Sequence, residues 1–284
     1  MNALKTAKAP KEIPVEVLRS AARVGGRLKG FEWLGGLSGR SVAALHGVSA
    51  SVVVKGPAVA AEVEIAGRLA GDFERHGIRT PTIFAIVETS SAGTWLVMER
   101  LPHPLPQERW GVDLQVIDTL RSLHSLPQGL VASLRYGFQP GWDSAMTRSA
   151  VSALHADAAT AQHLEDLERC AQPLFARRCV ISGDPNPLNW RVDHAGFPVL
   201  LDLERLTIAS PALDLAILLP GLPDRSEAEA LTSAYGPDSP SVDEILWAKA
   251  WTVVEMASTS AASRQARDVL RAVRGAFLAW LEQV

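Results

Sequence analysis

Cysteine is scarce in this chain, with two residues among 284. Cys170 and Cys179 form no CxxC spacing, and no run of His and Cys lies near them in the sequence. The pattern therefore excludes a disulfide framework and a structural zinc site. A reducing compartment fits this composition best, so we expect a cytoplasmic protein.

An excess of positive charge and a long apolar run are also missing. The 28 Lys and Arg residues face 31 Asp and Glu residues, and the resulting net charge of −3 leaves no global positive field to gather nucleic acid. The most apolar stretch, residues 206–223, is interrupted by Asp214 and three prolines, and the first 14 residues lack the apolar core of an export signal. We therefore expect neither a nucleic-acid partner nor a membrane span.

The first hundred residues have the pattern of a small sheet with helices. β-rich runs separated by turn residues predict five antiparallel strands, at 31–34, 41–45, 48–55, 82–87 and 94–98. Apolar residues at helical spacing predict a helix over 15–24, ended by Gly25-Gly26, and another over 58–76, ended by Gly77.

The pattern changes after Leu101. Three prolines at 102, 104 and 106 interrupt regular structure, and the chain beyond them is mostly helical, with helices expected at 113–126, 150–176 and in the last forty residues. Short apolar runs at 179–181 and 198–201 are the exceptions. The sequence thus predicts an α+β protein with a sheet-based lobe over 1–101 and a helical lobe over 102–284.

The second of these parts holds an unusual segment, Asp184-Pro-Asn-Pro-Leu-Asn189, followed by Asp202 at the end of an apolar run and then by Glu204. Phosphoryl transfer from a nucleotide needs a carboxylate to orient the attacking hydroxyl, and an amide and a second carboxylate to hold magnesium. Asp184, Asn189 and Asp202 match these three parts, with the Asp-x4-Asn spacing of a kinase catalytic loop. The alternative is a proline-rich turn whose polar side chains only cap backbone groups.

The sheet-based part supplies further components in the order that such an enzyme needs. The glycine-rich segment 35–39, with Gly36, Ser38 and Gly39, offers backbone N–H groups to phosphates, although such a segment can also be a simple turn. Lys55 ends an apolar strand, where it serves either as a phosphate-binding ammonium or as a solvated strand end. Of the acidic residues in the following helix, Glu62 is the preferred partner of Lys55, and Glu64 is the alternative.

These features together resemble the family of aminoglycoside phosphotransferases and choline kinase-like enzymes, which are small-molecule kinases. The resemblance spans about residues 30–220 and rests on the segments just described together with Leu96-Val-Met-Glu99-Arg-Leu101, Leu120-Arg-Ser-Leu-His124 and Pro211-Ala-Leu-Asp214. It implies a two-lobed protein kinase-like fold, ATP and Mg²⁺ as cofactors, and adenine bonded to the backbone near Glu99 to Leu101. It also implies a structural Asp214 that holds the catalytic loop 182–189 through backbone N–H groups.

Some positions depart from the family pattern or have two interpretations. Ser182 replaces the family's usual histidine before Gly183-Asp184, which predicts an altered rigidity of the loop. Glu204 could bind a second magnesium, as Asp-x-Glu pairs do in choline kinase-like members, or form an ion pair with Arg205 or Arg191. His124 shares a helix face with Ile117 and Leu120, which favours a packed core histidine over a catalytic base.

The acceptor is the least determined part of the prediction. Residues 221–245 hold six Asp or Glu and one Arg, so a cationic acceptor such as an aminoglycoside or another antibiotic is favoured, unless this segment is simply a solvated acidic surface. A metabolic kinase for choline, an amino alcohol or a sugar is the first alternative. A weakened, nucleotide-binding pseudokinase is the second. The sequence predicts no particular oligomeric state.

Overall fold

The computed structural model describes residues 12–34, 40–262 and 264–284. The chain forms two compact units, which are described separately. Unit 1 comprises the chain up to Pro104 together with residues 134–136 and 191–204, and unit 2 comprises residues 105–133, 137–190 and 205–284. This partition differs from a single division at residue 101, because two later segments of the chain pack within unit 1.

Unit 1 is built on a five-stranded antiparallel sheet with the strand order β1-β2-β3-β5-β4. The strands are β1 (Leu28–Trp33), β2 (Ser41–Gly47), β3 (Ser51–Gly56), β4 (Ile83–Glu88) and β5 (Thr94–Glu99). The five strands expected from the sequence are therefore present, with β3 beginning three residues later than predicted because Val48 and Ser49 belong to the turn.

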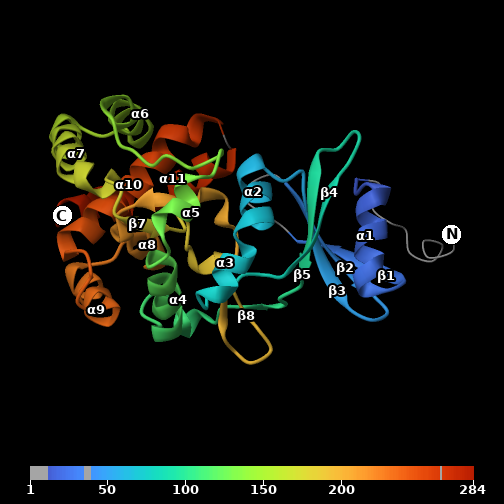
Figure 1. The fold of residues 1–284 in the computed structure, drawn as a ribbon. Helices are drawn as coiled ribbons and strands as arrows, with labels where there is room; N and C mark the ends of the chain where they lie inside the picture. Colours follow the sequence, from blue (N-terminus) through green and yellow to red (C-terminus); the bar gives the residue numbers. More distant parts are fainter. Residues whose placement is uncertain (1–11, 35–39, 263) are drawn as a thin grey trace. The chain divides into compact units, whose positions relative to one another are not determined.

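One face of this sheet is covered by α1 (Val15–Gly25), as Figure 1 shows. The helix presents Val17, Leu18 and Ala21 to Val52 and Val54 in a shared hydrophobic core. Successive side chains of a strand point to opposite faces, so Val53 and Lys55 lie on the face of β3 away from α1. The packing of α1 thus fixes the direction in which Lys55 projects.

The segment after β3 forms two helices, where the sequence predicted one over 58–76. They are α2 (Ala60–Arg68) and α3 (Ala70–Arg75), with Leu69 between them. Gly67 and Gly71 flank this break, and glycine is a weak helix former. Glu62 lies in the first turn of α2 and is one of its two buried residues, with Ile65.

A small three-stranded sheet with the order β6-β8-β9 precedes Asp202. Its strands are β6 (His103–Pro104), β8 (Trp190–Val192) and β9 (Pro198–Leu200). Within unit 1, Arg79 forms an ion pair with Asp193 at 2.8 Å and its guanidinium lies over the ring of Phe197. These contacts secure the turn between β8 and β9.

Unit 2 is mainly helical. Its only sheet in the described residues is the antiparallel pair β7 (Cys179–Ile181) and β10 (Thr207–Ala209). Its helices are α4 (Leu114–His124), α5 (Gln128–Ala132), α6 (Ser144–Leu154), α7 (Ala158–Ala171), α8 (Pro211–Leu218), α9 (Arg225–Tyr235), α10 (Val242–Thr259) and α11 (Arg264–Leu281). None of the described helices combines the length and apolar character needed to cross a bilayer.

The core of unit 2 forms around α10, which packs against α6, α8 and α11 (Figure 1). Trp251 is 1% exposed, and it donates a hydrogen bond from its indole N–H to the Gly141 carbonyl at 2.9 Å. Trp280 packs near the end of α11 and bonds to the Pro223 carbonyl. These tryptophans serve the packing of the helices.

The helix expected over 150–176 is two helices, α6 and α7. Asp143 and Asp157 cap their N-termini by accepting bonds from Met146 N–H and Thr160 N–H. His155 lies between them in the left-handed region, with φ of 46°. Two aspartate caps fourteen residues apart are the signal that separates these helices.

Candidate active site

Lys55 lies at the centre of an ion-pair cluster in unit 1. Its ammonium is 2.8 Å from Glu62 and 2.9 Å from Asp202. The side chain of Lys55 is 10% exposed and that of Glu62 is 11% exposed, so this pair is largely removed from water. The ion pair favoured by the sequence, Lys55 with Glu62, is present. Glu64 instead contacts Arg68 and accepts bonds from the N–H groups of Arg135 and Tyr136.

The two members of this pair respond differently to burial. Burial lowers the pKa of Lys55, but the carboxylates of Glu62 and Asp202 outweigh this effect and raise the pKa above its usual value. Burial raises the pKa of Glu62, and the charge of Lys55 offsets this only in part. The ammonium of Lys55 is therefore held firmly in its charged form.

A second cation, Arg40, joins the cluster through Glu204. Its guanidinium contacts the Glu204 carboxylate directly and lies 3.8 Å from Glu62. The sequence suggested Arg205 or Arg191 as ion-pair partners of Glu204, but the observed partner is Arg40. Arg205 pairs with Glu255 of α10 instead, at 2.6 Å. No spacing rule connects positions 164 residues apart, so Arg40 could not be found from the sequence.

Asp202 follows β9 and has a left-handed backbone, with φ of 55°. Aspartate tolerates this region better than most residues, and such strain concentrates at functional positions. Its side chain is 32% exposed, and one of its carboxylate oxygens, Oδ1, accepts a bond from Lys55. The strained backbone therefore turns a partly accessible carboxylate toward the Lys55 ammonium.

The loop after β7 in unit 2 is anchored by Asp214. This carboxylate is completely buried and accepts bonds from the N–H groups of Ser182 and Gly183, both at 2.8 Å. The Ser182 hydroxyl also donates to Asp214, at 3.2 Å. The structural role that the resemblance implied for Asp214 is present here, with Ser182 as an additional donor.

Gly183 itself is required by the geometry of this loop. Its φ is 78°, and a Cβ atom at this position would collide with the backbone carbonyl of Arg205. Both features favour glycine, because a side chain would be strained and would also have no room. Residue 183 thus brings the loop close to the segment that precedes β10.

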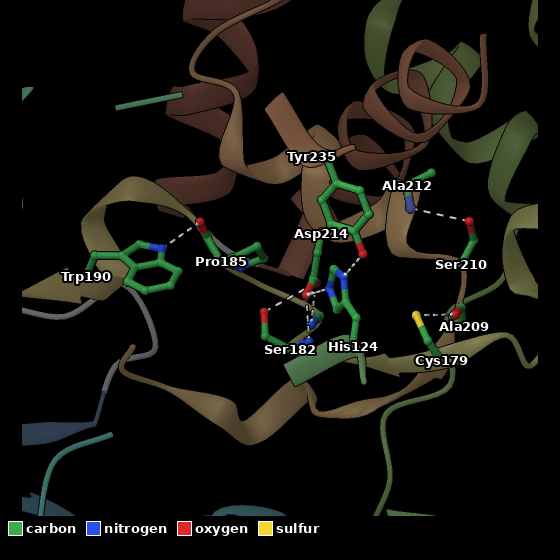
Figure 2. A network of polar contacts seen from close by, with 11 residues as sticks. His124, Cys179, Ser182, Pro185, Trp190, Ala209, Ser210, Ala212, Asp214 and Tyr235 are labelled. Carbon is green, nitrogen blue, oxygen red and sulfur yellow. Dashed lines mark hydrogen bonds and ion pairs between the residues drawn. The ribbon is translucent and has the colours of Figure 1, made fainter. Parts of the chain in front are cut away.

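His124 completes the buried network, as Figure 2 shows. Its two ring nitrogens lie 2.8 Å from the Tyr235 hydroxyl and 3.1 Å from Asp214. The side chain is 4% exposed. His124 is therefore a hydrogen-bonded core residue, as the sequence favoured, and it helps to orient the Asp214 carboxylate. Tyr235, one of two tyrosines in the chain, carried no sequence signal for this contact.

Asp184 and Asn189 are both half-buried and lie on one short loop. The Asn189 side chain donates to the backbone carbonyl of Asp184 at 3.0 Å. Asn186 caps the single-turn helix at 187–189 by accepting from Leu188 N–H. Trp190 is fully buried and bonds to the Pro185 carbonyl (Figure 2). The loop thus contains the caps of a proline-rich turn, and it also fixes the positions of Asp184 and Asn189 relative to each other.

The other residues that the sequence predicted for nucleotide binding are only partly covered by the structure. Gly36, Ser38 and Gly39 lie outside the described residues. The Glu99 carboxylate accepts bonds from the N–H and hydroxyl of Thr82, and Leu101 is half-buried. The Glu99 side chain is therefore occupied, and a backbone contact to adenine at 99–101 stays a prediction.

The acidic segment is largely engaged in local structure. Glu227 forms a capping box with Asp224 at the start of α9, and Glu244 caps α10 while pairing with Arg178. Asp243 pairs with Arg225 at 2.7 Å. This arrangement leaves exposed Glu229 and Asp238 without an ion pair in the described part of the chain.

The described residues bring no three His, Cys, Asp or Glu side chains together as a metal site. Magnesium needs no such cage, since it commonly uses one or two carboxylates together with substrate phosphates. Within unit 1, Asp202 and Glu204 carry oxygen ligands of the kind that this ion prefers.

Solved structures of other proteins resemble this chain in fold. The chain matches no curated protein sequence at a significant level. A solved structure of aminoglycoside 2'-phosphotransferase-IIIa with GDP aligns with a TM-score of 0.70 at 12% identity, over 94% of this chain and 99% of that one. Spectinomycin phosphotransferase APH(9)-Ia with ADP and spectinomycin aligns with a TM-score of 0.64 at 15% identity, over 95% and 94%.

A third structure is macrolide 2'-phosphotransferase MphH from Brachybacterium faecium, with a TM-score of 0.59 at 16% identity, over 92% of this chain and 97% of that one. These likenesses concern the fold, and they confirm the kinase-like α+β architecture expected from the sequence. The model of the phosphotransferase enzyme family APH matches residues 32–245. The chain therefore belongs to the APH family of phosphotransferase enzymes.

Proposed function

We propose that this phosphotransferase moves the γ-phosphoryl group of ATP to a hydroxyl of a small molecule. The observation that carries the proposal is the Lys55 ammonium held between Glu62 and Asp202 in unit 1. A largely buried cation held by Glu62 is already positioned for the oxygens of a nucleotide phosphate, and this pairing can persist when the nucleotide binds.

The glycine-rich segment with Gly36, Ser38 and Gly39 would bind the same phosphates through backbone N–H groups. The backbone at Glu99 to Leu101 would bind adenine. Magnesium would be held by Asn189 and Asp202, with Glu204 available for a second ion. When bound, the metal neutralises charge on the phosphate oxygens. Asp202 and Glu204 would then exchange their present contacts with Lys55 and Arg40 for the metal.

Asp184 would accept the proton of the acceptor hydroxyl. The loop that carries it is fixed by two short N–H bonds to Asp214 and by the bond from Asn189 to the Asp184 carbonyl. A general base of this kind typically contributes on the order of 10² to 10⁴ in rate when it is well positioned. Ser182 supplies one of the anchoring N–H groups, so its replacement of the family's usual histidine leaves this anchoring in place.

The acceptor is proposed to be a small alcohol-bearing compound, with a cationic one favoured by charge. Exposed Glu229 and Asp238 are the carboxylates that support this preference, since Glu227, Asp243 and Glu244 are engaged in caps and ion pairs. The related structures include complexes of other enzymes with kanamycin and with spectinomycin, which makes aminocyclitol antibiotics reasonable first members of a test panel.

A screen of ADP release tests this proposal. Purified protein with ATP and Mg²⁺ is offered aminoglycosides, macrolides, amino alcohols and sugars, each with a no-acceptor control and an EDTA control. We expect ADP release that depends on both Mg²⁺ and one acceptor class. Release that no compound stimulates, in a protein shown to bind ATP, would contradict the assignment of transfer to a small-molecule hydroxyl.

A further inference from the structure

Unit 2 contains a cavity of about 940 Å³ that the proposed function does not use. It is bounded by α6, by the end of α10 and by α11. Helix α6 contributes Arg148, Ser149 and Ser152, and the left-handed residue His155 follows that helix. A cavity of this size accommodates a ligand of metabolite dimensions.

The charge of this cavity is strongly positive. Its lining includes the four arginines Arg148, Arg267, Arg271 and Arg274, and it includes no Asp or Glu. Three of them recur at positions 267, 271 and 274, a spacing that places them on one face of α11. The nearby carboxylate of Asp268 pairs with Arg271 at 3.3 Å and lies outside the lining.

Within the described part of the chain, most of the guanidinium donors in the cavity have no hydrogen-bond or ion-pair partner. Each guanidinium has five N–H donors. Arg267 donates to the Ala261 carbonyl at 2.7 Å, and Arg274 donates weakly to the His155 carbonyl at 3.5 Å. The Nε atom of Arg274 is buried and has no hydrogen-bond partner. Among the described residues, no carboxylate forms an ion pair with Arg148, Arg267 or Arg274.

The alternative to ligand binding is that these arginines cap the carbonyl groups at helix ends. It accounts for one donor of Arg267 and one of Arg274, and for none of Arg148. The buried Nε of Arg274 is a donor that such capping leaves without a partner, and a buried donor of this kind is uncommon unless something else binds it. Several arginines sharing a cavity also repel one another in the absence of an anion.

We propose that this cavity binds a small polyanion with phosphate or carboxylate groups. Guanidinium forks match both groups in a bidentate geometry. The hydroxyls of Ser149 and Ser152, which line the cavity on the same helix as Arg148, provide additional neutral donors. The site uses none of the residues assigned to ATP, magnesium or proton transfer, so it stands independently of the proposed function.

Isothermal titration of the full chain with pyrophosphate, and separately with citrate, tests the proposal. The two probes distinguish a phosphate-binding site from a carboxylate-binding site. The variant Arg148→Ala/Arg274→Ala removes two of the four charges, and Arg274→Lys keeps the charge but loses the fork. Arg225→Ala, which removes an exposed arginine of the same unit outside the cavity, is the matched control. Thermal unfolding of each variant checks that it is folded.

All titrations are repeated in a Lys55→Met background, which weakens binding at the proposed nucleotide-phosphate position. We expect saturable binding of at least one probe, weakened about 100-fold by the double variant, since each charge-assisted contact contributes about tenfold. Arg274→Lys should weaken it about tenfold, and Arg225→Ala should leave it unchanged. Absence of binding by the wild type, or binding that the double variant and Arg274→Lys leave unchanged, would overturn the proposal.

Discussion

Asp214 anchors the loop that carries Asp184, and its replacement by asparagine tests that anchoring. The two carboxylate oxygens receive four contacts. Oδ1 accepts from Gly183 N–H and the Ser182 hydroxyl, and Oδ2 accepts from Ser182 N–H and lies 3.1 Å from His124. An asparagine keeps one acceptor oxygen and places an NH₂ group where the other oxygen was. His124 can change tautomer to accept from that NH₂, but Ser182 N–H cannot.

The expected cost follows from these contacts. One buried N–H loses its partner, which costs about 2 kcal/mol, and the remaining bonds to a charged acceptor become bonds to a neutral one, which costs about 1 kcal/mol more. We therefore expect Asp214→Asn to lower the free energy of unfolding by about 3 kcal/mol. In conditions where the variant is folded, kcat for ADP release should fall more than the KM for ATP rises, because the loop and not the Lys55 cluster is disturbed.

Urea unfolding and steady-state ADP release measure these two effects. Asp118→Asn is the matched control, because Asp118 is an exposed carboxylate of the same unit whose side chain is 69% accessible and pairs with Arg121 at 3.3 Å. Its removal should change the free energy of unfolding by less than about 0.5 kcal/mol. If Asp214→Asn unfolds at the same urea concentration as the wild type, the anchoring role is refuted.

The other predictions concern three positions. Lys55→Met should raise the KM for ATP on the order of tenfold or more and lower kcat. Lys29 is exposed, so the control Lys29→Met should leave both constants unchanged. Wild-type constants in the Lys55→Met enzyme would remove Lys55 from phosphate binding. Gly183→Ala should lower the free energy of unfolding by about 3 kcal/mol, because residue 183 has a positive φ and its new Cβ would collide with the Arg205 carbonyl. Gly129→Ala should cause no such loss, because a Cβ at residue 129 meets open space. Equal effects of the two substitutions in urea unfolding would contradict the steric argument. Burial lowers the pKa of Lys249 to about 8, so the unfolded chain binds more protons between about pH 8 and 10 and the stability contributed by this group rises with pH across that window. The free energy of unfolding of Lys249→Met minus that of the wild type should therefore fall by roughly 2–3 kcal/mol between pH 7.5 and pH 10 in urea unfolding. If this difference is the same at both pH values, the pKa of Lys249 is not lowered in the folded chain.

The sheet and the chemistry-bearing loop could be predicted from the sequence because their signals are local. Alternation of apolar residues indicated the strands of unit 1. Glu62 stands three and seven residues before Ile65 and Leu69, and this helical spacing favoured it over Glu64 as the partner of Lys55. The Asp-x4-Asn pattern identified the loop of Asp184 and Asn189, whose side chain and backbone contact each other in the structure.

The features that were missed depend on contacts between distant positions. The pairing of Arg40 with Glu204 joins residues 164 apart in the chain, and the sequence offered the neighbouring Arg205 instead. Tyr235 reaches His124 from another helix. The division of 58–76 at Leu69 and of 150–176 at His155 shows that apolar periodicity alone overestimates helix length where glycines or aspartate caps intervene. The acidic segment illustrates the same limit, because composition cannot tell capping carboxylates from free ones.

Transfer of a radiolabelled γ-phosphate in a single turnover tests the central assignment most directly. Wild type and Asp184→Asn are each loaded with labelled ATP and Mg²⁺, mixed with the acceptor found by the ADP-release screen, and the label on the acceptor hydroxyl is followed in time. We predict equal ATP binding by the two proteins and transfer slowed on the order of 10² to 10⁴ in the variant. Transfer at the same rate in both would contradict the role of Asp184 as the base that activates the hydroxyl.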